Sequence, residues 1–381
     1  MSQRSRHHLH RSTNGADASD GSNEKSGNTP CSMIFVTGAS RSGTSMLARL
    51  LGEHKEILAL QETHYFGDLC DPDEAKALKS DEQLEQLSAI LLARQNRGLW
   101  DSKPNASEQQ QARQLVSSLP SNARSAGEVF SATLNHLATA SGKSIGLEQT
   151  PRNIFYAEQL LALYPKARIV HIVRDPRAVL ASQRNRWRMR QLGAGHIPSF
   201  EMLRTWVNYH PVTMSKLWSE ANQQALRLLH RKHFLLVRFE DLVDAPQKEI
   251  QRICDFLDIT FDPMMLDVPR WGSSNITHST SQRGISHEVR DLWQGCLPVG
   301  DRILCEWLTR PTMKRFGYHP LPAGRADRLQ SWAKILTYPL HMVGVISLNP
   351  KRAWTLLKAL SIAGATRSSP PKTKSYLPPS G

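Results

Sequence analysis

The sequence lacks the cysteine patterns that indicate a metal-held or disulfide-held fold. Its five cysteines, spread over 381 residues, include no C-x-x-C pair. This spacing argues against a zinc site and a disulfide scaffold, and it favours a reducing compartment. No internal repeat and no known nucleic-acid-binding module is visible, so we expect no nucleic-acid partner. The length fits one large domain with appendages, or at most two or three small domains.

The first 30 residues lack the apolar segment of a secretory signal peptide. They are polar, rich in Ser, Asn and Gly, and nearly free of large apolar side chains. We therefore predict that residues 1–30 form a disordered tail, although the HHLH run at 7–10 has metal-binding chemistry. Together with the cysteine pattern, this composition predicts a cytoplasmic protein.

Acidic residues are nearly absent from the C-terminal segment. Residues 310–381 contain 12 Lys or Arg and one acidic residue, Asp327, so they carry +11 of the net charge of +14. This excess indicates an anionic partner such as a membrane surface, an acidic glycan or nucleic acid, unless the segment is a solvated tail. The apolar run at 332–348 is interrupted by Lys334, Pro339 and His341, which makes it marginal for the about 20 apolar residues of a membrane span.

Residues 323–381 are predicted to form a basic amphipathic extension. Lys351, Arg352 and Lys358 alternate with Trp354 and several leucines. Basic residues beside Trp and Leu are typical of helices that lie on an anionic membrane, here at its cytoplasmic face. Ordinary helices that pack on the main domain would explain the same pattern.

Short apolar runs alternate with helical patterns along the rest of the chain. Strands are predicted at 33–37, 144–147 and 167–173, a further apolar run lies at 234–237, and helices are predicted at 44–53, 153–163, 177–186 and 246–257. Residues 74–141 are mostly helical in pattern, and a helical stretch over 200–231 is broken at Pro211. This alternation predicts an α/β fold of three layers, with a mostly parallel sheet flanked by helices and with helical insertions.

A glycine-rich turn joins the first predicted strand to the first predicted helix. Gly38 and Gly43, within TGASRSGTS at 37–45, have the G-x4-G spacing of a phosphate-binding P-loop. Such a turn lets backbone amides face an anion, and the helix that follows adds its positive N-terminal end. Thr44 stands where a Walker A motif has lysine, which argues against a nucleotide kinase or other P-loop phosphotransferase. A turn that only caps the helix through Ser42 or Thr44 remains an alternative.

A second motif begins at the end of the strand predicted over 167–173. Arg174 opens the run RDPRAVLAS, and Ser182 lies about two helical turns further along. Ligands of open parallel sheets bind at the carboxyl ends of strands, so Arg174 and Ser182 could hold one phosphate group. Alternatively, Arg174 and Asp175 form a structural ion pair.

Taken in order, these motifs resemble the PAPS-dependent sulfotransferases, closest to the branch with the tyrosylprotein sulfotransferases and bacterial relatives. The resemblance rests on TGASRSGTSMLARLL (37–51), LALQETHYF (58–66), LEQTPRN (147–153), IVRDPRAVLAS (172–182) and VRFEDLVDAPQKEIQRICDFLDI (237–259). It implies a P-loop-like fold and a sulfotransferase domain over 31–322. It also implies transfer of a sulfuryl group from 3′-phosphoadenosine 5′-phosphosulfate (PAPS) to a hydroxyl-bearing acceptor, with no metal.

The resemblance assigns cofactor contacts to particular residues. The group that would hold the 5′-phosphosulfate comprises Arg41, Ser42, Gly43, Thr44 and Ser45. Arg174 and Ser182 would hold the 3′-phosphate. Arg283 is a further candidate there, although the basic residue of the family is not in clean register with it.

The resemblance also implies catalytic roles. Glu62 falls where the tyrosylprotein enzymes keep their general base, and His64 is a competing base because cytosolic sulfotransferases use histidine. Arg41 would stabilise charge on the leaving phosphate, and Ser279 resembles the serine that steadies the sulfate.

One departure from the family pattern is plain. Gln149 stands where the family usually has lysine, and Arg152 is a nearby cation that could substitute. A catalytically weak binding relative is therefore an alternative to an active enzyme. The acceptor class stays open among carbohydrates, lipid-linked sugars, peptide tyrosines and small alcohols.

Overall fold

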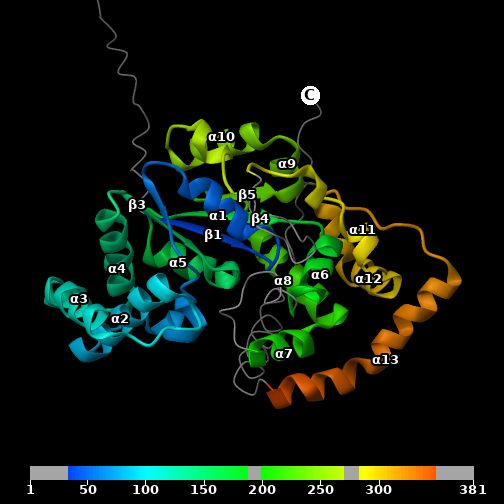
Figure 1. Cartoon of the computed structure of the whole chain (residues 1–381), viewed down its shortest axis with the longest axis horizontal. Coiled ribbons are helices and arrows are strands. Elements are labelled where there is room, and N and C mark those ends of the chain that lie inside the picture. Colours follow the sequence, from blue (N-terminus) through cyan, green and yellow to red (C-terminus); the bar gives the residue numbers. More distant parts are fainter. Residues whose placement is uncertain (1–32, 188–198, 270–282, 349–381) are drawn as a thin grey trace, which may run out of the picture.

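A parallel five-stranded sheet with the order β2-β3-β1-β4-β5 forms the centre of the molecule (Figure 1). The computed structural model describes residues 33–187, 199–269 and 283–348. The strands are β1 (Met33–Gly38), β2 (Ile57–Ala59), β3 (Ile145–Gln149), β4 (Arg168–Val173) and β5 (Phe234–Arg238). All four pairings between them are parallel, which confirms the predicted sheet.

The alternating side chains of β1 show how the layers are built. Ile34 and Val36 belong to one buried cluster, whereas Met33 and Phe35 belong to the other. Successive side chains of a strand point to opposite faces, so the two clusters lie on the two faces of the sheet. The helices of the first cluster are α1 (Thr44–Gly52), α9 (Phe239–Asp244) and α10 (Pro246–Leu257), and those of the second are α4 (Ala126–Ala140), α5 (Ala157–Leu163) and α8 (Pro211–Leu228). The three-layer prediction is confirmed.

The remaining helices are α6 (Pro176–Arg184), which directly follows β4, and the helices of the insertions and of the C-terminal part. The latter are α2 (Asp81–Arg97), α3 (Ala106–Ser117), α7 (Ser199–Asn208), α11 (Trp293–Cys296), α12 (Val299–Arg315) and α13 (Arg325–Leu348). Helices α2, α3 and α4 pack together as the predicted helical insertion. The break predicted at Pro211 is also confirmed, because α7 ends at Asn208 and Pro211 is the first residue of α8. The predicted helix over 153–163 begins instead as a 3₁₀ turn, Pro151–Tyr156.

Helix α12 and the residues after it pack on α6 and α8. Arg177 on α6 donates from Nη1 to Glu306 Oε1 at 3.1 Å. Phe316 meets the Trp218 ring edge-on, with ring centroids 6.3 Å apart. The Tyr318 hydroxyl donates to Glu240 Oε2 at 2.5 Å. These contacts of the C-terminal part therefore fix α6 and α8 in place beside the carboxyl edge of the sheet.

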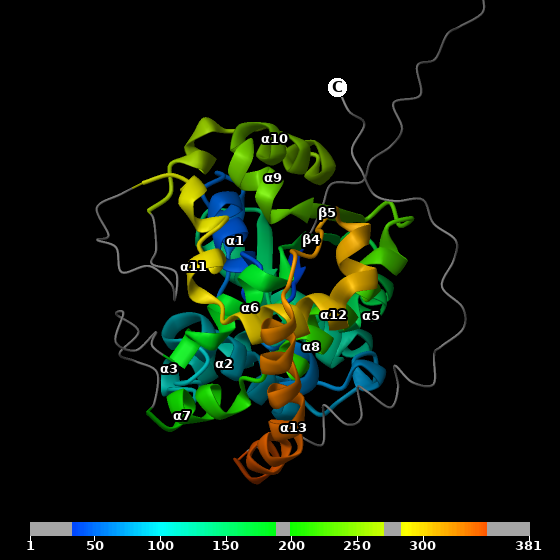
Figure 2. The ribbon, with the colours of Figure 1, turned by 90° about the vertical axis from the view of Figure 1, so that its right-hand side faces the viewer.

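Two terminal segments were predicted from the sequence, a polar tail and a basic extension, and the structure describes only part of the extension. The predicted tail over 1–30 and the residues after Leu348 lie outside the described part of the chain. The described portion of the predicted extension is the long helix α13, which stands at the edge of the molecule (Figures 1 and 2). Among the described helices, none is long and apolar enough to cross a membrane.

His171 on β4 is hydrogen-bonded to Thr37 on β1 and to Asn222 on α8. Strands β1 and β4 both lead into the predicted phosphate-binding motifs. Its Nδ1 lies 3.1 Å from Thr37 Oγ1 and its Nε2 lies 3.2 Å from Asn222 Oδ1. Asn222 uses its Nδ2 to donate to the Trp218 carbonyl, so its oxygen accepts from His171 Nε2. Burial lowers the pKa of His171 and so keeps the ring neutral at neutral pH, and in this tautomer Nδ1 accepts from the Thr37 hydroxyl.

Acidification should destabilise the fold through His171. Burial lowers the pKa of His171 from 6.5 to about 4. The unfolded chain binds this proton first, so the contribution to stability is complete above pH 6.5 and is lost as the pH falls to about 4. The free energy of unfolding should fall by about 3 kcal/mol over this pH range, which urea unfolding at several pH values would measure.

The variant His171→Gln tests the source of this pH dependence. It should be less stable near neutral pH and show a flatter stability profile between pH 7 and 4. Burial also lowers the pKa of His210 to about 4, so the comparison must be between variant and parent. An unchanged slope in the variant would contradict the assignment to His171.

Candidate active site

The turn between β1 and α1 has the backbone shape of an anion-binding loop. Arg41 and Gly43 have positive φ angles of 77° and 102°. A Cβ at Gly43 would lie 2.6 Å from a Phe239 ring carbon, so a glycine is required there. Helix α1 begins with no side-chain cap. Ser42 Oγ is buried without a hydrogen-bond partner among the described residues, and Thr44 Oγ1 accepts from Gln149. The turn is therefore not a simple helix cap.

Arginine side chains converge next to this loop. Arg41 donates from Nε to Ser182 Oγ at 3.0 Å, which joins the two predicted phosphate-binding motifs. Burial, followed by repulsion from Arg186 and Arg174, lowers the pKa of Arg41 to about 10. In residues 33–187, 199–269 and 283–348, no carboxylate forms an ion pair with Arg41 or Arg174. The cluster is cationic and has the character of an anion site.

Arg174 is buried at the carboxyl end of β4. Its guanidinium lies 4.0 Å from the centre of the Phe239 ring, and its Nη2 donates to the Val289 carbonyl at 2.6 Å. Its Nε has no partner among the described atoms. The alternative ion pair between Arg174 and Asp175 is wrong, because Asp175 pairs with Arg177 at 2.6 Å.

Arg186 belongs to this cluster and was missed in the sequence. Its charge acts on both Arg41 and Glu62. It follows Ser182 by four residues, one helical turn, and that spacing from a proposed phosphate ligand was the available signal.

Glu62 lies between a histidine and an amide. Its Oε2 accepts from His64 Nε2 at 2.9 Å, and its Oε1 accepts from Gln149 Nε2 at 3.2 Å. Burial alone would raise the pKa of Glu62. The hydrogen bonds from His64 and Gln149 and the charge of Arg186 together hold the pKa below its usual value. Glu62 is therefore ionised at neutral pH, as a general base must be.

Gln149 ties this carboxylate to the P-loop. The same Nε2 also approaches Thr44 Oγ1 at 3.1 Å. Arg152, the proposed substitute for the family lysine, instead pairs with Asp68 at 2.7 Å. The position of the missing lysine is thus filled by a neutral amide that contacts the candidate base directly.

Glu148, which the sequence analysis also missed, supports the segment that carries Glu62 and His64. Its Oε1 accepts from Thr63 N at 3.0 Å, from Thr63 Oγ1 at 2.8 Å and from Thr150 Oγ1. Its Oε2 accepts from Asn153 Nδ2 at 2.6 Å. A glutamate inside a buried strand was the available signal, since such residues are rarely buried without partners.

Of the other predicted site residues, Ser45 belongs to the loop–helix junction, Ser279 lies outside the described ranges, and Arg283 forms an ion pair elsewhere. Ser45 is exposed in the first turn of α1, and Ser279 falls among the residues that the structure does not describe. Arg283 pairs with Asp267 at 2.7 Å, and the charge of Glu53, which follows the C-terminal end of α1, acts on Arg283. Its predicted contact with the 3′-phosphate stays a prediction.

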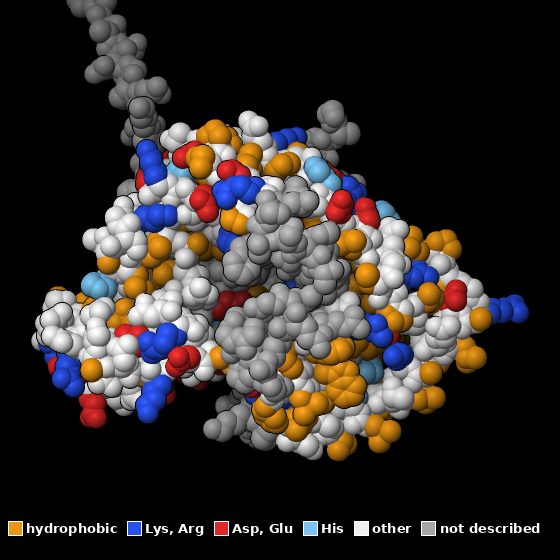
Figure 3. Space-filling view, in the orientation of Figure 1, with side chains coloured by type: hydrophobic (Ala, Val, Ile, Leu, Met, Phe, Trp, Pro, Cys, Tyr) orange, Lys and Arg blue, Asp and Glu red, His pale blue; other side chains and the backbone are white. Residues whose placement is uncertain are grey.

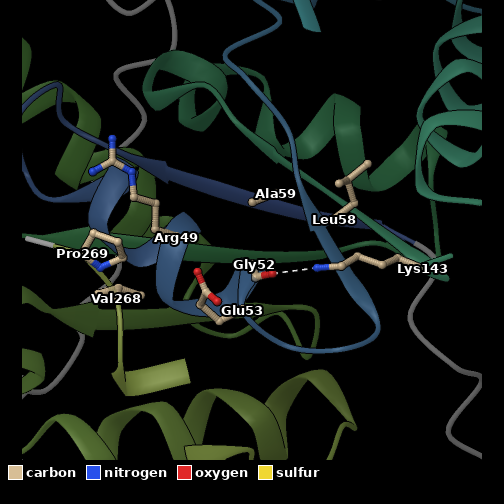
Figure 4. Close-up of a pocket in the computed structure, with 8 residues that line it drawn as sticks. All are labelled: Arg49, Gly52, Glu53, Leu58, Ala59, Lys143, Val268 and Pro269. Carbon is tan, nitrogen blue, oxygen red and sulfur yellow. Dashed lines mark hydrogen bonds between the residues drawn. The ribbon is translucent and has the colours of Figure 1, made fainter. Parts of the chain in front are cut away.

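A pocket at that far end of α1 is distinct from the candidate site (Figure 4). It is lined by Arg49, Gly52, Glu53, Leu58, Ala59, Lys143, Val268 and Pro269. Lys143 extends across it and donates to the carbonyls of Gly52, His54 and Ile57 at 2.8, 3.2 and 2.6 Å. Its ammonium group thus binds carbonyls at the helix end, a structural role.

A model of the Sulfotransferase family matches residues 33–263. Nodulation protein NoeE of Sinorhizobium fredii is 27% identical over 240 residues, which cover 61% of this chain and 50% of that protein. Protein-tyrosine sulfotransferase A of Caenorhabditis elegans is 23% identical over 299 residues, covering 75% of this chain and 67% of that protein. Carbohydrate sulfotransferase 5 of Homo sapiens is 29% identical over 203 residues, covering 44% of this chain and 46% of that protein.

The alignments are partial for most of these relatives. The chain spans about half the length of NoeE and of carbohydrate sulfotransferase 5. Among solved structures, the sulfotransferase domain from the curacin biosynthetic pathway is 20% identical with a TM-score of 0.47, covering 77% of this chain and 99% of that one.

Proposed function

The chain belongs to the Sulfotransferase family, and we propose that it transfers a sulfuryl group from PAPS to a hydroxyl acceptor and releases PAP. The observation that carries the proposal is the cluster of arginines beside an anion-binding loop, with an ionised glutamate next to it. Among the described residues, neither Arg41 nor Arg174 forms an ion pair with a carboxylate, and Glu62 is the nearby base candidate.

The residues present fit the two anionic ends of PAPS. We assign the 5′-phosphosulfate to the loop residues Arg41, Ser42, Gly43, Thr44 and Ser45, and the 3′-phosphate to Arg174 and Ser182. Ser42 Oγ and Arg174 Nε are buried polar atoms without protein partners in the described structure, and a phosphate oxygen would satisfy each of them. Ser279 and Arg283 remain proposed contacts on the resemblance alone.

A small number of side chains would carry out the proposed sulfuryl transfer. PAPS, when bound, supplies an activated sulfuryl group and leaves as PAP. Glu62 would take the proton from the acceptor hydroxyl, and the hydrogen bonds from His64 and Gln149 fix its orientation. Arg41 would hold the negative charge at the 5′-phosphate end, where electrostatic stabilisation has most effect. No metal enters this proposal.

The acceptor is proposed only as a hydroxyl-bearing molecule. The names of the relatives include carbohydrate and protein-tyrosine sulfotransferases. A hydroxyl group is the chemistry that these two acceptor classes share. Mass spectrometry of acceptor mixtures incubated with the chain and PAPS would identify the class.

Titration calorimetry with PAP and with ATP–magnesium tests the donor. We expect PAP to bind with a micromolar Kd in the absence of magnesium and ATP–magnesium to bind at least about tenfold more weakly, because Thr44 replaces the Walker lysine. A clear preference for ATP–magnesium would indicate a nucleotide kinase instead. If PAP binds but no acceptor class yields PAP from PAPS, the chain is a binding relative rather than an enzyme.

A further inference from the structure

Over its described length, helix α13 packs against the rest of the protein along one side only. It packs against α12, α7 and α8. Tyr338 and His341 lie against His210 at the start of α8, with ring centroids 4.8 and 4.7 Å from it. A Cβ at Gly344 would lie 3.7 Å from Val207 of α7. The inner side of α13 is thus fixed to the fold.

The other side of α13 exposes a row of large apolar side chains. Trp332, Leu336 and Leu340 are 61%, 78% and 77% exposed. The row begins with Leu329 and continues through Val343 and Ile346. Their spacing of three or four residues places them on one stripe of the helix.

Helix α7 extends this surface. Phe200, Leu203 and Trp206 are spaced by three residues, and all three are exposed. Figure 3 shows hydrophobic side chains gathered over α7 and along α13 at the lower edge of the molecule. We call this set of residues on α7 and α13 the α7/α13 surface. Contiguous apolar surfaces of this kind mark contacts with proteins or membranes.

The charges around the α7/α13 surface favour an anionic partner. Arg325 and Arg328 are exposed and lie seven and four residues before Trp332, on the same stripe. Asp327 turns back to accept from the Gly324 amide at 3.0 Å. Among the described residues after Arg328, Lys334 is the one further Lys or Arg, and none is acidic; the sequence beyond Leu348, outside the described part of the chain, adds six Lys or Arg and no acidic residue. Two copies of this surface would repel each other, which argues against a second copy as the partner.

We infer that the α7/α13 surface binds the interface of an anionic lipid membrane, with α13 lying in the plane of the membrane. Tryptophan, phenylalanine and leucine would enter the boundary between headgroups and acyl chains, and the arginines would contact anionic headgroups. This inference is independent of sulfuryl transfer, because vesicle binding and PAP binding are measured separately.

Co-sedimentation of the full chain with vesicles tests the inference. The probes are phosphatidylcholine vesicles with about one third phosphatidylglycerol and vesicles of phosphatidylcholine alone. We expect binding to the anionic vesicles and at least about tenfold weaker binding to the neutral ones. The double variant Leu336→Gln/Leu340→Gln, which leaves charge unchanged, should lower the partition coefficient at least about tenfold.

A matched control separates this surface from exposed leucine in general. Leu78 is 66% exposed and lies on another part of the chain, so Leu78→Gln should bind vesicles like the parent. Equal PAP affinity and equal melting temperature in all variants would show intact folding. The inference is overturned if the parent does not bind anionic vesicles, or if the double variant binds them as well as the parent. It is also overturned if light scattering shows a dimer that the double variant dissociates while vesicles are not bound.

Discussion

Replacing Glu62 with glutamine should lower the turnover number by about 10²- to 10⁴-fold and leave PAP affinity unchanged. The amide keeps the size of the side chain but cannot take a proton from the acceptor. Because Glu62 is ionised in the folded protein, its loss removes a base that is already in its active form. PAP release under saturating PAPS measures turnover, and calorimetry measures affinity.

Changes at His64 distinguish the two candidate bases. His64→Gln retains an amide donor that can reach Glu62, so turnover should fall far less than in Glu62→Gln. If Glu62→Gln retains full activity while His64→Ala abolishes it, His64 is the base and Glu62 its positioning partner.

Replacing Arg174 with alanine should weaken PAP binding by about 10- to 150-fold, which corresponds to the roughly 1.5–3 kcal/mol of a hydrogen bond to a charged group. Ser182→Ala, which removes a neutral donor, should have a smaller effect. Both residues would contact the phosphate in the ground state and in the transition state, so turnover under saturating PAPS should change little. Calorimetry and steady-state kinetics measure the two quantities.

Two further variants test whether a loss of PAP affinity in Arg174→Ala comes from the lost charge or from a disturbed structure. Its guanidinium also packs on Phe239, so alanine removes a contact as well as a charge. Arg174→Lys keeps the charge and should bind PAP with intermediate affinity. Arg113→Ala removes an exposed arginine of α3 and should bind PAP normally. Unchanged PAP affinity in Arg174→Ala, with normal folding, would contradict its assignment.

The sequence predicted the central strands because parallel strands buried on both faces are continuous apolar runs. Strands β1 and β4 are of this kind. Strand β2 has three residues, Ile57–Ala59, too few for a pattern. Helix α12 contains Pro311 and α13 contains Pro339, residues that normally argue against a helix interior. Both helices pack on neighbouring helices, α12 on α6 and α8 and α13 on α7 and α8, and these tertiary contacts cannot be read from the local sequence.

The candidate site was predictable where its chemistry lies in contiguous motifs. Arg41 and Ser182 come from two such motifs, although their hydrogen bond could not be read from either. The double contact of Gln149 with Glu62 and Thr44 depends on three segments meeting at the sheet edge. For that reason the sequence suggested Arg152 as a replacement for the absent lysine, whereas the structure places Gln149 itself in that position.

The contacts of α12 and of Tyr318 extend the cooperative folding unit beyond the end of the family match. The family match ends at residue 263. Yet Glu306 balances the buried charge of Arg177, and Tyr318 satisfies Glu240, which also accepts from the Asp175 amide. A chain cut at residue 263 would retain the five motifs that carry the resemblance. It would leave Arg177 with part of its charge uncompensated and the Trp218 ring without its contact with Phe316. The part of the chain that carries the recognised motifs therefore depends for its stability on residues that lie beyond the family match.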